Sequence, residues 1–355
     1  MLLSDVYLWL AYSGISTRKL NRLLEEVPLT KLWDSFGEDT TRLNLDDKTF
    51  STLKRSHNED YIKKIKYYLE INHIEYVTRA DPLFPESLSQ REVDPPLALF
   101  YKGDIYLARG DKNLAVVGTR RASPYGKYAT EKIVKELAYS GFTIVSGLAT
   151  GIDGFAHAAT LDVGGKTVAV LGSGINNVTP VSNLALFDKI CKVGLVLSEY
   201  PPDVHGSVYT FPQRNRIISG LSKGVLVVEA AEKSGALITA DCALEQGRDV
   251  FAVPGDIDKP RSIGTNKLIK QGGIAVTSAA DILDYYGQST ITKPQTIALD
   301  FTEQRVMDIL SSGETTFDAL VEKSGLTVSE LNTALSSLII YGLVHEKSKN
   351  LYTAT

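Results

Sequence analysis

The pattern of apolar and polar positions changes along the 355 residues and divides the chain into regions. In the first region apolar residues recur with helical spacing, as in Leu20, Leu23 and Leu24, which predicts a small all-α domain over residues 1–80. Residues 81–105 then contain four prolines and are predicted to form an extended connector, because proline fixes φ and lacks an amide donor.

Residues 106–286 have a different pattern, in which short apolar runs alternate with helical segments. The seven runs are Leu114–Val117, Thr143–Val145, Thr167–Leu171, Leu195–Leu197, Val225–Val228, Val250–Val253 and Ile274–Val276. Continuous runs rich in β-branched residues indicate strands that are buried on both faces. Their alternation with helices indicates right-handed crossovers, so the predicted fold class is α/β with a doubly wound parallel sheet.

The C-terminal part of the chain follows a third pattern. Residues 287–298 are polar and aperiodic, as in a linker. Residues 299–355 predict three helices and a hairpin, at Thr302–Leu310, Thr316–Glu322, Thr327–Tyr341 and Leu343–Tyr352. This order of elements is typical of a winged-helix domain.

The net charge of −4 argues against a simple polycation that coats nucleic acid. Residues 106–298 carry 20 basic and 17 acidic side chains, whereas residues 299–355 carry 4 basic and 8 acidic ones. Because the positive surplus of the middle region is small, an anion site there depends on where individual side chains lie.

Composition also limits the kinds of site. The chain has two cysteines, Cys191 and Cys242, which excludes a disulfide scaffold. No cysteine or histidine spacing suits a zinc finger, so we expect no metal and no cofactor. Because the sequence has no membrane-length apolar run and no basic leader, we expect a cytoplasmic protein without a membrane span.

Glycine-rich loops follow the first three predicted strands of the middle region. They read Gly118-Thr119-Arg120-Arg121, Ser146-Gly147-Leu148-Ala149-Thr150-Gly151 and Gly172-Ser173-Gly174. Ligands of open α/β sheets bind at the carboxyl ends of the strands, where glycines admit an anion and helix N-termini offer amides. A tight turn explains each glycine taken alone, whereas three such loops, one with two arginines, favour a phosphate-binding cradle.

Two common phosphate-binding motifs are absent. The first loop has one glycine and two arginines, so it lacks the GxGxxG fingerprint of a dinucleotide-binding Rossmann fold. No GxxxxGK[ST] sequence occurs either, so a P-loop nucleotide hydrolase is not supported.

Two later segments supply further candidate residues. Phe211, Arg214, Asn215 and Arg216 come just before an apolar helical run. The two arginines point in different directions from a helix start, so one could meet the cradle while the other braces the fold. Phe211 fits either stacking on an unpaired base or packing in the core. Ser234-Gly235 opens a helix and could offer amides to the same ligand.

Candidates for acid–base chemistry are few. Asp153 and His157 lie four residues apart on one predicted helix and could pair. No nucleophile accompanies them, so no enzymatic activity is predicted. At a helix N-terminus the simpler role for Asp153 is a cap or a loop brace.

Taken in order, these motifs resemble the DNA-processing protein A (DprA/Smf) family over most of the chain. The matching elements include Val117 to Arg120, Ser146 to Asp153, Leu171 to Gly174, Pro180 with Asn183, Leu197 to Pro202, Phe211 to Ser222, Val227 to Ala230, Ser234 to Ala240 and Ala252 to Gly255. The resemblance implies an extended Rossmann-like fold at residues 106–286 that binds single-stranded DNA. It also implies a homodimer that covers incoming strands and loads the RecA recombinase during natural transformation.

The same resemblance implies a winged-helix C-terminal domain and an N-terminal domain like a sterile alpha motif or a helix-hairpin-helix. For the segment around Gly14 a small helical packing module is the alternative. By position, Arg120, Arg214 and Arg216 would contact the anion. The residues placed around the phosphate are Gly118, Thr119, Ser146, Gly147, Gly172, Ser173, Gly174 and Asn183. The predicted site is completed by Arg121, Ala149, Gly151, Phe211, Asn215, Ser234 and Gly235.

The sequence departs from the family pattern in two places. Relatives often carry a basic residue after Tyr-Pro in the third loop, where this chain reads Thr179-Pro180-Val181, so a contact is missing or comes from Arg121 or Lys127. The predicted recognition helix has no lysine or arginine, although contacts with phosphate and guanine need them. We therefore expect the C-terminal domain to be a protein-interaction or regulatory module.

Two other function classes stay open as alternatives. A nucleotide-processing enzyme of the phosphoribohydrolase type would carry PGGxGTxxE where this chain reads Glu229 to Thr239, and that motif is absent. A transcription regulator would read duplex DNA through the winged helix, which the missing basic residues argue against.

Overall fold

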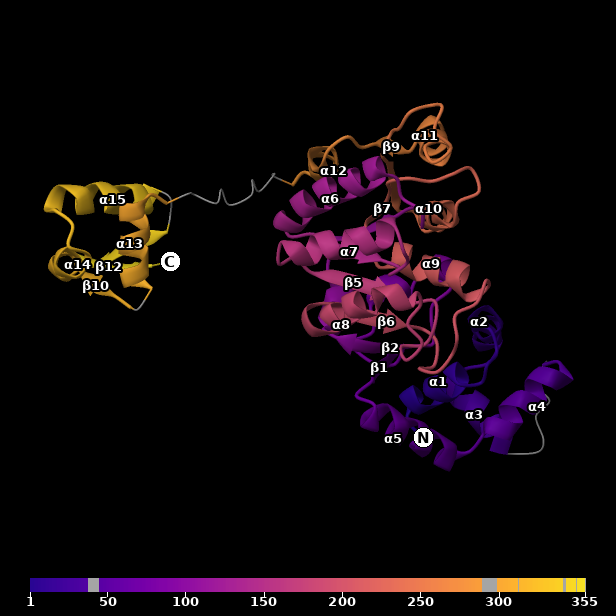
Figure 1. Cartoon of the computed structure of the whole chain (residues 1–355). Helices are drawn as coiled ribbons and strands as arrows, with labels where there is room; N and C mark the ends of the chain where they lie inside the picture. The colour runs from indigo at the N-terminus through magenta and orange to yellow at the C-terminus, as the bar shows by residue number, and fades with distance from the viewer. Residues whose placement is uncertain (38–44, 289–298, 312, 341–342, 349, 355) are drawn as a thin grey trace. The chain divides into compact units, whose positions relative to one another are not determined.

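The computed structural model describes residues 1–37, 45–288, 299–311, 313–340, 343–348 and 350–354. The chain divides into two compact units, Met1–Ile291 and Thr292–Thr355 (Figure 1). Each unit has a hydrophobic core of its own.

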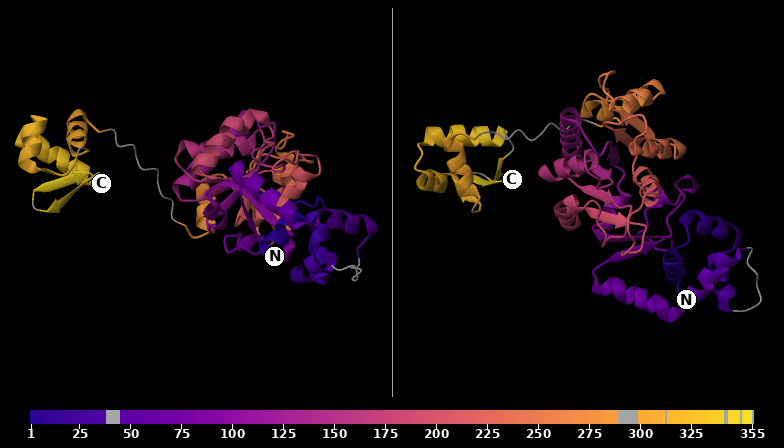
Figure 2. Two further views of the ribbon diagram at one scale, coloured as in Figure 1. Left: turned by 90° about the horizontal axis from the view of Figure 1, so that it is seen from below. Right: turned by 45° about the vertical axis from the view of Figure 1, so that its right-hand side comes forward.

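Among the described residues five helices begin the first unit, and Figure 2 shows them gathered at one end of it. They are α1 (Leu3–Ala11), α2 (Thr17–Glu26), α3 (Leu29–Gly37), α4 (Asp47–Ser56) and α5 (Glu59–Ile71). The fully buried Trp9 ring contacts Trp33 and Phe36 edge-on, at centroid distances of 5.1 and 5.6 Å. Tyr12 meets Phe100 of the sheet in the same way at 5.7 Å, so the helices pack on the sheet instead of standing apart.

In the part of the unit that the structure describes, nine strands form one sheet in the order β1-β2-β6-β5-β4-β3-β7-β8-β9. They are β1 (Glu75–Thr78), β2 (Ala98–Gly103), β3 (Asn113–Val117), β4 (Thr143–Ser146), β5 (Thr167–Val170), β6 (Leu195–Ser198), β7 (Gly224–Val227), β8 (Asp249–Ala252) and β9 (Ile274–Ala275). The first two strands pair antiparallel, β2 pairs antiparallel with β6, and the other pairs are parallel. All seven predicted strands are present, and the α/β, Rossmann-like fold class is confirmed.

Residues 81–105 do more than connect, which corrects the prediction made from their prolines. The segment contains β2, whose Phe100 lies opposite Ser198 of β6. The last proline of the segment, Pro96, precedes Ala98, so every residue of the strand keeps its amide donor. Four successive buried residues then give β2 the burial of a central strand, and the sheet extends beyond the predicted Rossmann region.

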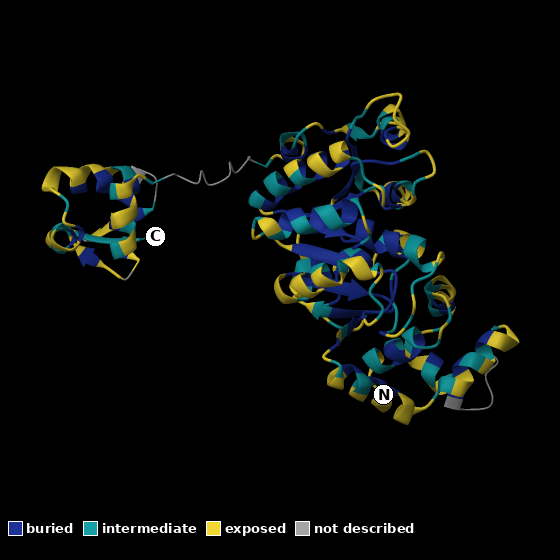
Figure 3. Ribbon diagram, in the orientation of Figure 1, coloured by how far each residue is buried: buried dark blue, intermediate teal, exposed yellow. Residues whose placement is uncertain are grey.

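Helices cover both faces of the sheet, and alternate residues of each strand face different helices. Leu114 and Val116 of β3 pack with α6, α7 and α12, whereas Ala115 and Val117 pack with α9, α10 and α11. These helices are α6 (Pro124–Tyr139), α7 (Ile152–Asp162), α9 (Thr210–Gly220), α10 (Gly235–Glu245), α11 (Ile263–Lys270) and α12 (Ala279–Tyr285), and α8 (Leu184–Val193) covers β5, β6 and β2. Figure 3 shows the strands buried between these layers.

The direction of the chain through the sheet reverses at β3. The chain first adds β4, β5 and β6 on one side of β3, and then returns to add β7, β8 and β9 on the other side. The carboxyl ends of β3 and β7 therefore form the topological switch point, where open α/β sheets bind their ligands.

The second unit has the order of a winged helix, as predicted. Its elements are α13 (Phe301–Leu310), β10 (Thr315–Thr316), α14 (Phe317–Ser324), α15 (Val328–Ile340), β11 (Val344–Ser348) and β12 (Leu351–Ala354). The short strand β10, which the sequence does not predict, pairs with β12. Leu331, Leu335 and Leu338 of α15 lie in the core of this unit. The helical spacing of these leucines therefore reflects packing inside the unit.

Candidate functional site

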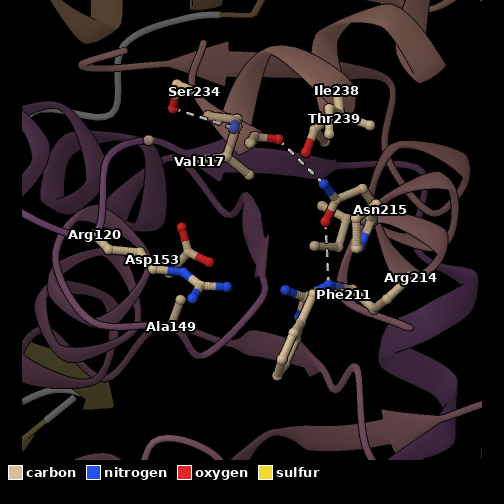
Figure 4. Close-up of a pocket in the computed structure, with 15 residues that line it drawn as sticks. Val117, Arg120, Ala149, Asp153, Phe211, Arg214, Asn215, Ser234, Ile238 and Thr239 are labelled. Atoms are coloured by element: carbon tan, nitrogen blue, oxygen red, sulfur yellow. Dashed lines mark hydrogen bonds between the residues drawn. The ribbon is translucent and has the colours of Figure 1, made fainter. Parts of the chain in front are cut away.

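A pocket of about 270 Å³ opens at the switch point of the sheet (Figure 4). It is bordered by the end of β3, the loop between β4 and α7, the first part of α9 and the start of α10. The lining residues are Val117, Gly118, Arg120, Ala149, Asp153, Phe211, Pro212, Arg214, Asn215, Ile218, Ser234, Gly235, Ala236, Ile238 and Thr239. Segments that lie more than 100 residues apart in the sequence thus meet in one pocket.

The structure brings some predicted site residues together here and separates others. Those that line the pocket are Gly118, Arg120, Ala149, Phe211, Arg214, Asn215, Ser234 and Gly235. The predicted residues outside this lining are Thr119, Arg121, Ser146, Gly147, Gly151, Gly172, Ser173, Gly174, Asn183 and Arg216. Several of the second group hold the first group in place, as their contacts show.

Gly147 and Gly172 make room for the side chains that face the pocket. A Cβ on Gly147 would lie 2.5 Å from Nη1 of Arg214, and one on Gly172 would lie 2.6 Å from the Phe211 ring. Because real Cβ atoms do not approach that closely, any side chain at either position would displace its neighbour. The two glycines therefore act through Arg214 and Phe211.

Gly151 and Gly174 join backbone segments in a similar way. Gly151 has φ of +77°, and a Cβ there would lie 2.3 Å from the carbonyl oxygen of Thr119. The amide of Ile152 donates to that same carbonyl over 3.2 Å, which ties the second loop to the first. A Cβ on Gly174 would lie 2.1 Å from the carbonyl oxygen of Pro201. These two glycines therefore allow the loops to approach each other closely, and they do not serve to expose backbone amides.

The polar residues of the loops bond to the protein itself. Ser146 Oγ donates to the Val116 carbonyl over 2.6 Å, and Ser173 Oγ donates to the Asn177 carbonyl over 2.7 Å. Asn183 Nδ2 donates to the carbonyls of Leu148 and Ala149, over 2.9 and 3.0 Å. These bonds fix the loop conformations, and direct phosphate contact by the three side chains stays a prediction.

Arg214 is a buried cation in the wall of the pocket, with 4% of its surface exposed. Its Nη1 donates to the carbonyls of Gly147, over 2.8 Å, and of Val170. Its Nε donates to Asn215 Oδ1 over 3.3 Å. Burial lowers the pKa of the guanidinium to about 10, so it stays charged at neutral pH.

Asp153 supplies the opposite charge in the same pocket. Burial raises the pKa of its carboxyl, while the Arg214 charge and the backbone amides of Ala149 and Gly147 oppose that rise. The sequence predicts a cap or a loop brace here, and the structure adds that the carboxylate lines the pocket. The sequence contains a hint of this position, because Asp153 follows the glycines of the second loop and lies in the first turn of α7, which begins at Ile152.

Arg120 is the exposed cation of the pocket. Its guanidinium lies 5.3 Å from the centre of the Phe211 ring, within the range of a cation–π contact. Phe211 is partly buried and also lines the pocket, so its ring packs against Gly172 on one side and borders the cavity. The pocket therefore joins an aromatic surface to two arginines, the exposed Arg120 and the buried Arg214.

Arg216 lies outside the pocket and is already paired. Its Nη2 lies 2.7 Å from Oε2 of Glu199, and the two side chains are 12% and 4% exposed. Thr17 Oγ1 donates to the same carboxylate over 3.2 Å, and Arg18 Nε lies 3.7 Å from Asp94. The start of α2 is thus attached to the sheet-containing core, as a helical packing module would be. For Arg216 these contacts favour the bracing role over the anion contact.

His157 does not pair with Asp153, which corrects the prediction from their spacing. Its Nδ1 lies 2.7 Å from Thr167 Oγ1, and that hydroxyl donates to the Ile144 carbonyl. Complete burial lowers the pKa of the imidazole to about 3, so the ring is neutral at physiological pH. Among the described residues no cluster of three His, Cys, Asp or Glu side chains could hold a metal ion. No helix in the described ranges is long and apolar enough to cross a membrane.

Residues 75–287 match the family model of DNA recombination-mediator protein A. The chain is a member of this family. Residues 291–347 also match the model of the DprA winged helix domain. DNA processing protein DprA of Bacillus subtilis (strain 168) is 40% identical over 277 residues, which cover 75% of this chain and 92% of the relative. Protein Smf of Escherichia coli (strain K12) is 45% identical over 264 residues, covering 71% of this chain and 70% of the relative.

Solved structures of the family agree with the fold. The crystal structure of DNA processing protein A from Streptococcus pneumoniae superposes with a TM-score of 0.68 and 37% identity, over 80% of this chain and 98% of that one. The protein from Helicobacter pylori, solved for its single-stranded DNA binding mode, gives a TM-score of 0.54 and 30% identity, over 60% of this chain and 96% of that one. Family membership places the chain in DNA processing and recombination.

Proposed function

We propose that the chain binds single-stranded DNA in the pocket at the switch point, without enzymatic action on it. The observation that carries this proposal is the contact between Arg120 and Phe211 beside the buried charge of Arg214. Unpaired bases stack on aromatic rings with little sequence preference, and arginines hold the phosphates. The Helicobacter pylori relative, which binds single-stranded DNA, has the same fold.

Each of the three side chains has a distinct role in this proposal. Arg120 is exposed and contacts the phosphate of an entering nucleotide. Phe211 provides the surface on which the base lies. Arg214 is immobilised by two carbonyls, so its charge attracts the strand without needing to reorganise. Val181 is 78% exposed at the position where relatives often carry a basic residue, so this chain depends more on Arg120.

The direct test compares binding of labelled oligo-dT and of the matching duplex by the full chain across a salt series. Single-strand preference with a negative log–log salt slope is expected, because bound phosphates release counterions. Arg120→Ala should weaken binding and reduce the slope by about one. Arg22→Ala on α2, also an exposed arginine, is the matched control and should change neither. If the wild-type chain binds no single strand at low salt, the pocket holds a smaller phosphate ligand, and free nucleotides should then be screened.

The finer part of the proposal concerns recombination. A chain that covers incoming single strands and loads RecA on them would act as a homodimer in natural transformation, as the resemblance to its family implies. The test is RecA-driven strand exchange on single strands covered with single-strand binding protein. Addition of the chain should restore exchange, and Arg120→Ala should not. Light scattering of the pure chain across a concentration series measures whether it dimerises.

A further inference from the structure

A second and larger cavity, of about 720 Å³, lies beside the first on the same edge of the sheet. We propose that it is a second nucleotide-binding subsite, which takes a further nucleotide of the same single strand. Its lining residues are Ser123, Pro124, Tyr125, Glu229, Pro254, Gly255, Asp256, Lys259, Pro260, Arg261 and Ser262. The inference rests on the proposed function of the first pocket.

Two loops connect the cavities. The loop between β3 and α6 places Gly118 and Arg120 in the first pocket and Ser123 in the second. The loop between β7 and α10 places Glu229 in the second pocket and Ser234 in the first. Because both loops leave neighbouring strands at their carboxyl ends, the cavities adjoin across β3 and β7. A strand that enters at Arg120 therefore reaches the second cavity by following these loops.

The second cavity has an aromatic wall that is held in place. Tyr125 is 48% exposed, and its hydroxyl donates to the Pro254 carbonyl over 2.8 Å. This bond ties the start of α6 to the loop after β8 and fixes the orientation of the ring. A preorganised, half-exposed ring is suited to base stacking, since little side-chain freedom is lost on binding.

Positive charge stands around that ring. Lys259 and Arg261 are exposed in the loop after β8. The ion partner of Lys259 is its chain neighbour Asp258, at 3.3 Å, and both side chains are more than 60% exposed, so the pair is weak. Arg261 has no ion pair within the part of the chain that the structure describes.

Two acidic residues, Glu229 and Asp256, line the cavity, but only one of them directs its negative charge at a bound anion. The Glu229 carboxylate accepts from the amide of Ser123 over 2.8 Å and also from its hydroxyl. Its charge is thus directed into the first turn of α6, where the helix dipole stabilises it. Asp256 is exposed and remains the opposing charge. Phosphates of the strand would approach from the side of Lys259 and Arg261.

The subsite also gives a role to Arg121, which does not line the first pocket. Arg121 is exposed, and it stands in the chain between Arg120 of the first pocket and Ser123 of the second. A guanidinium at this junction suits the phosphate that links the two bound nucleotides. The path of the strand is then Phe211, Arg120, Arg121 and Tyr125.

The test uses the dependence of affinity on strand length. The full chain is titrated with the single nucleotide dTMP, which can fill one subsite, and with a long oligo-dT of about twenty nucleotides, which exceeds a typical single-strand site. Tyr125→Ala and the double variant Lys259→Ala/Arg261→Ala should weaken binding of the long strand about ten-fold and leave binding of dTMP in the first pocket unchanged. Tyr125→Phe keeps the ring and should stay within about three-fold of the wild type.

Three controls keep the inference separate from the proposed function. Arg120→Ala should weaken binding of both dTMP and the long strand, which reports on the first pocket alone. Thermal melting of each variant identifies loss of folding. A strand with 5-iodouracil at successive positions should photo-crosslink to Tyr125 at one internal position, as mass spectrometry of the peptide would show.

Two results would overturn the inference. If the Tyr125 and Lys259/Arg261 variants bind the long strand as the wild type does while Arg120→Ala does not, the second cavity takes no part and the first pocket stands. If Tyr125→Ala abolishes binding of free dTMP but leaves the long strand unaffected, the cavity holds a free nucleotide and not the strand. Loss of all single-strand binding in the wild type would instead contradict the proposed function itself.

Discussion

The guanidinium of Arg120 lies 5.3 Å from the centre of the Phe211 ring. This contact joins the loop after β3 to the first turn of α9, the helix that connects β6 to β7. An exposed cation and a partly buried ring are thereby presented together to one pocket. The predictions below follow from what holds this pair in place and from the charges around it.

Phe211→Leu should reduce affinity for oligo-dT about ten-fold or more, because base stacking on an aromatic ring contributes about 1–3 kcal/mol. Leucine keeps much of the volume that packs against Gly172 and Gly206. The melting temperature should therefore change little, and fluorescence anisotropy would measure the loss. Unchanged affinity would mean that Phe211 only fills the core.

Gly147→Ala should damage the pocket indirectly. The new Cβ would lie 2.5 Å from Arg214 Nη1, so the guanidinium must leave its two carbonyl partners. Overpacking of this kind costs about 1–3 kcal/mol of unfolding free energy. Gly235→Ala is the matched control, because a Cβ there meets nothing within 4 Å and alanine favours the helix. Urea denaturation would measure the free energy of unfolding of both variants. Equal values for the two variants would contradict the packing role of Gly147.

Arg216→Ala should lower the free energy of unfolding more than it lowers the affinity for single-stranded DNA. The substitution leaves the buried Glu199 carboxylate without its ion pair, and breaking a buried pair costs about 3–5 kcal/mol. Glu199→Gln in the same chain should recover part of that loss, since an amide needs no counter-charge. A stable Arg216→Ala variant that binds oligo-dT weakly would instead show that Arg216 contacts the strand.

Binding should strengthen as the pH falls below neutral. The pKa of Asp153 is raised by burial, so its carboxyl takes up a proton above the usual range for an aspartate. Protonation removes the negative charge that opposes Arg120 and Arg214, while phosphodiesters stay ionised. Arg214, with a pKa of about 10, and His157, with a pKa of about 3, do not change state in this window. Asp153→Asn should bind more tightly at neutral pH and show a flatter pH profile.

Removal of the second unit should leave single-strand affinity intact. Helix α15 contains no lysine or arginine over Val328–Ile340, so it lacks the side chains that contact phosphate and guanine. A chain that ends at Gln288 should match the full chain in binding oligo-dT at every salt concentration. A clear loss would assign DNA contacts to the winged helix and contradict the interpretation of this domain as a protein-interaction module.

The order of elements could be determined from the sequence because local patterns carry it. Continuous apolar runs marked the seven strands from Leu114 onward, and helical spacing marked the winged-helix unit. The prolines before Ala98 hid β2, because composition outweighed a short apolar run that pairs with β1 and with β6, and β6 lies far away in the chain. Strand pairing across such distances is decided by tertiary contacts.

The loops that form the candidate site could also be predicted from the sequence, since glycines and arginines that occur together at strand ends favour an anion-binding site. Only the tertiary structure decided which of these residues face the ligand. Asp153 lies 10 residues after Thr143 and Arg214 lies 71 residues after it, yet both side chains line one pocket. Arg216 instead pairs with Glu199, and His157 contacts Thr167. A side chain's direction and its charged partners depend on the packing of several elements at once, and no single stretch of sequence contains that information.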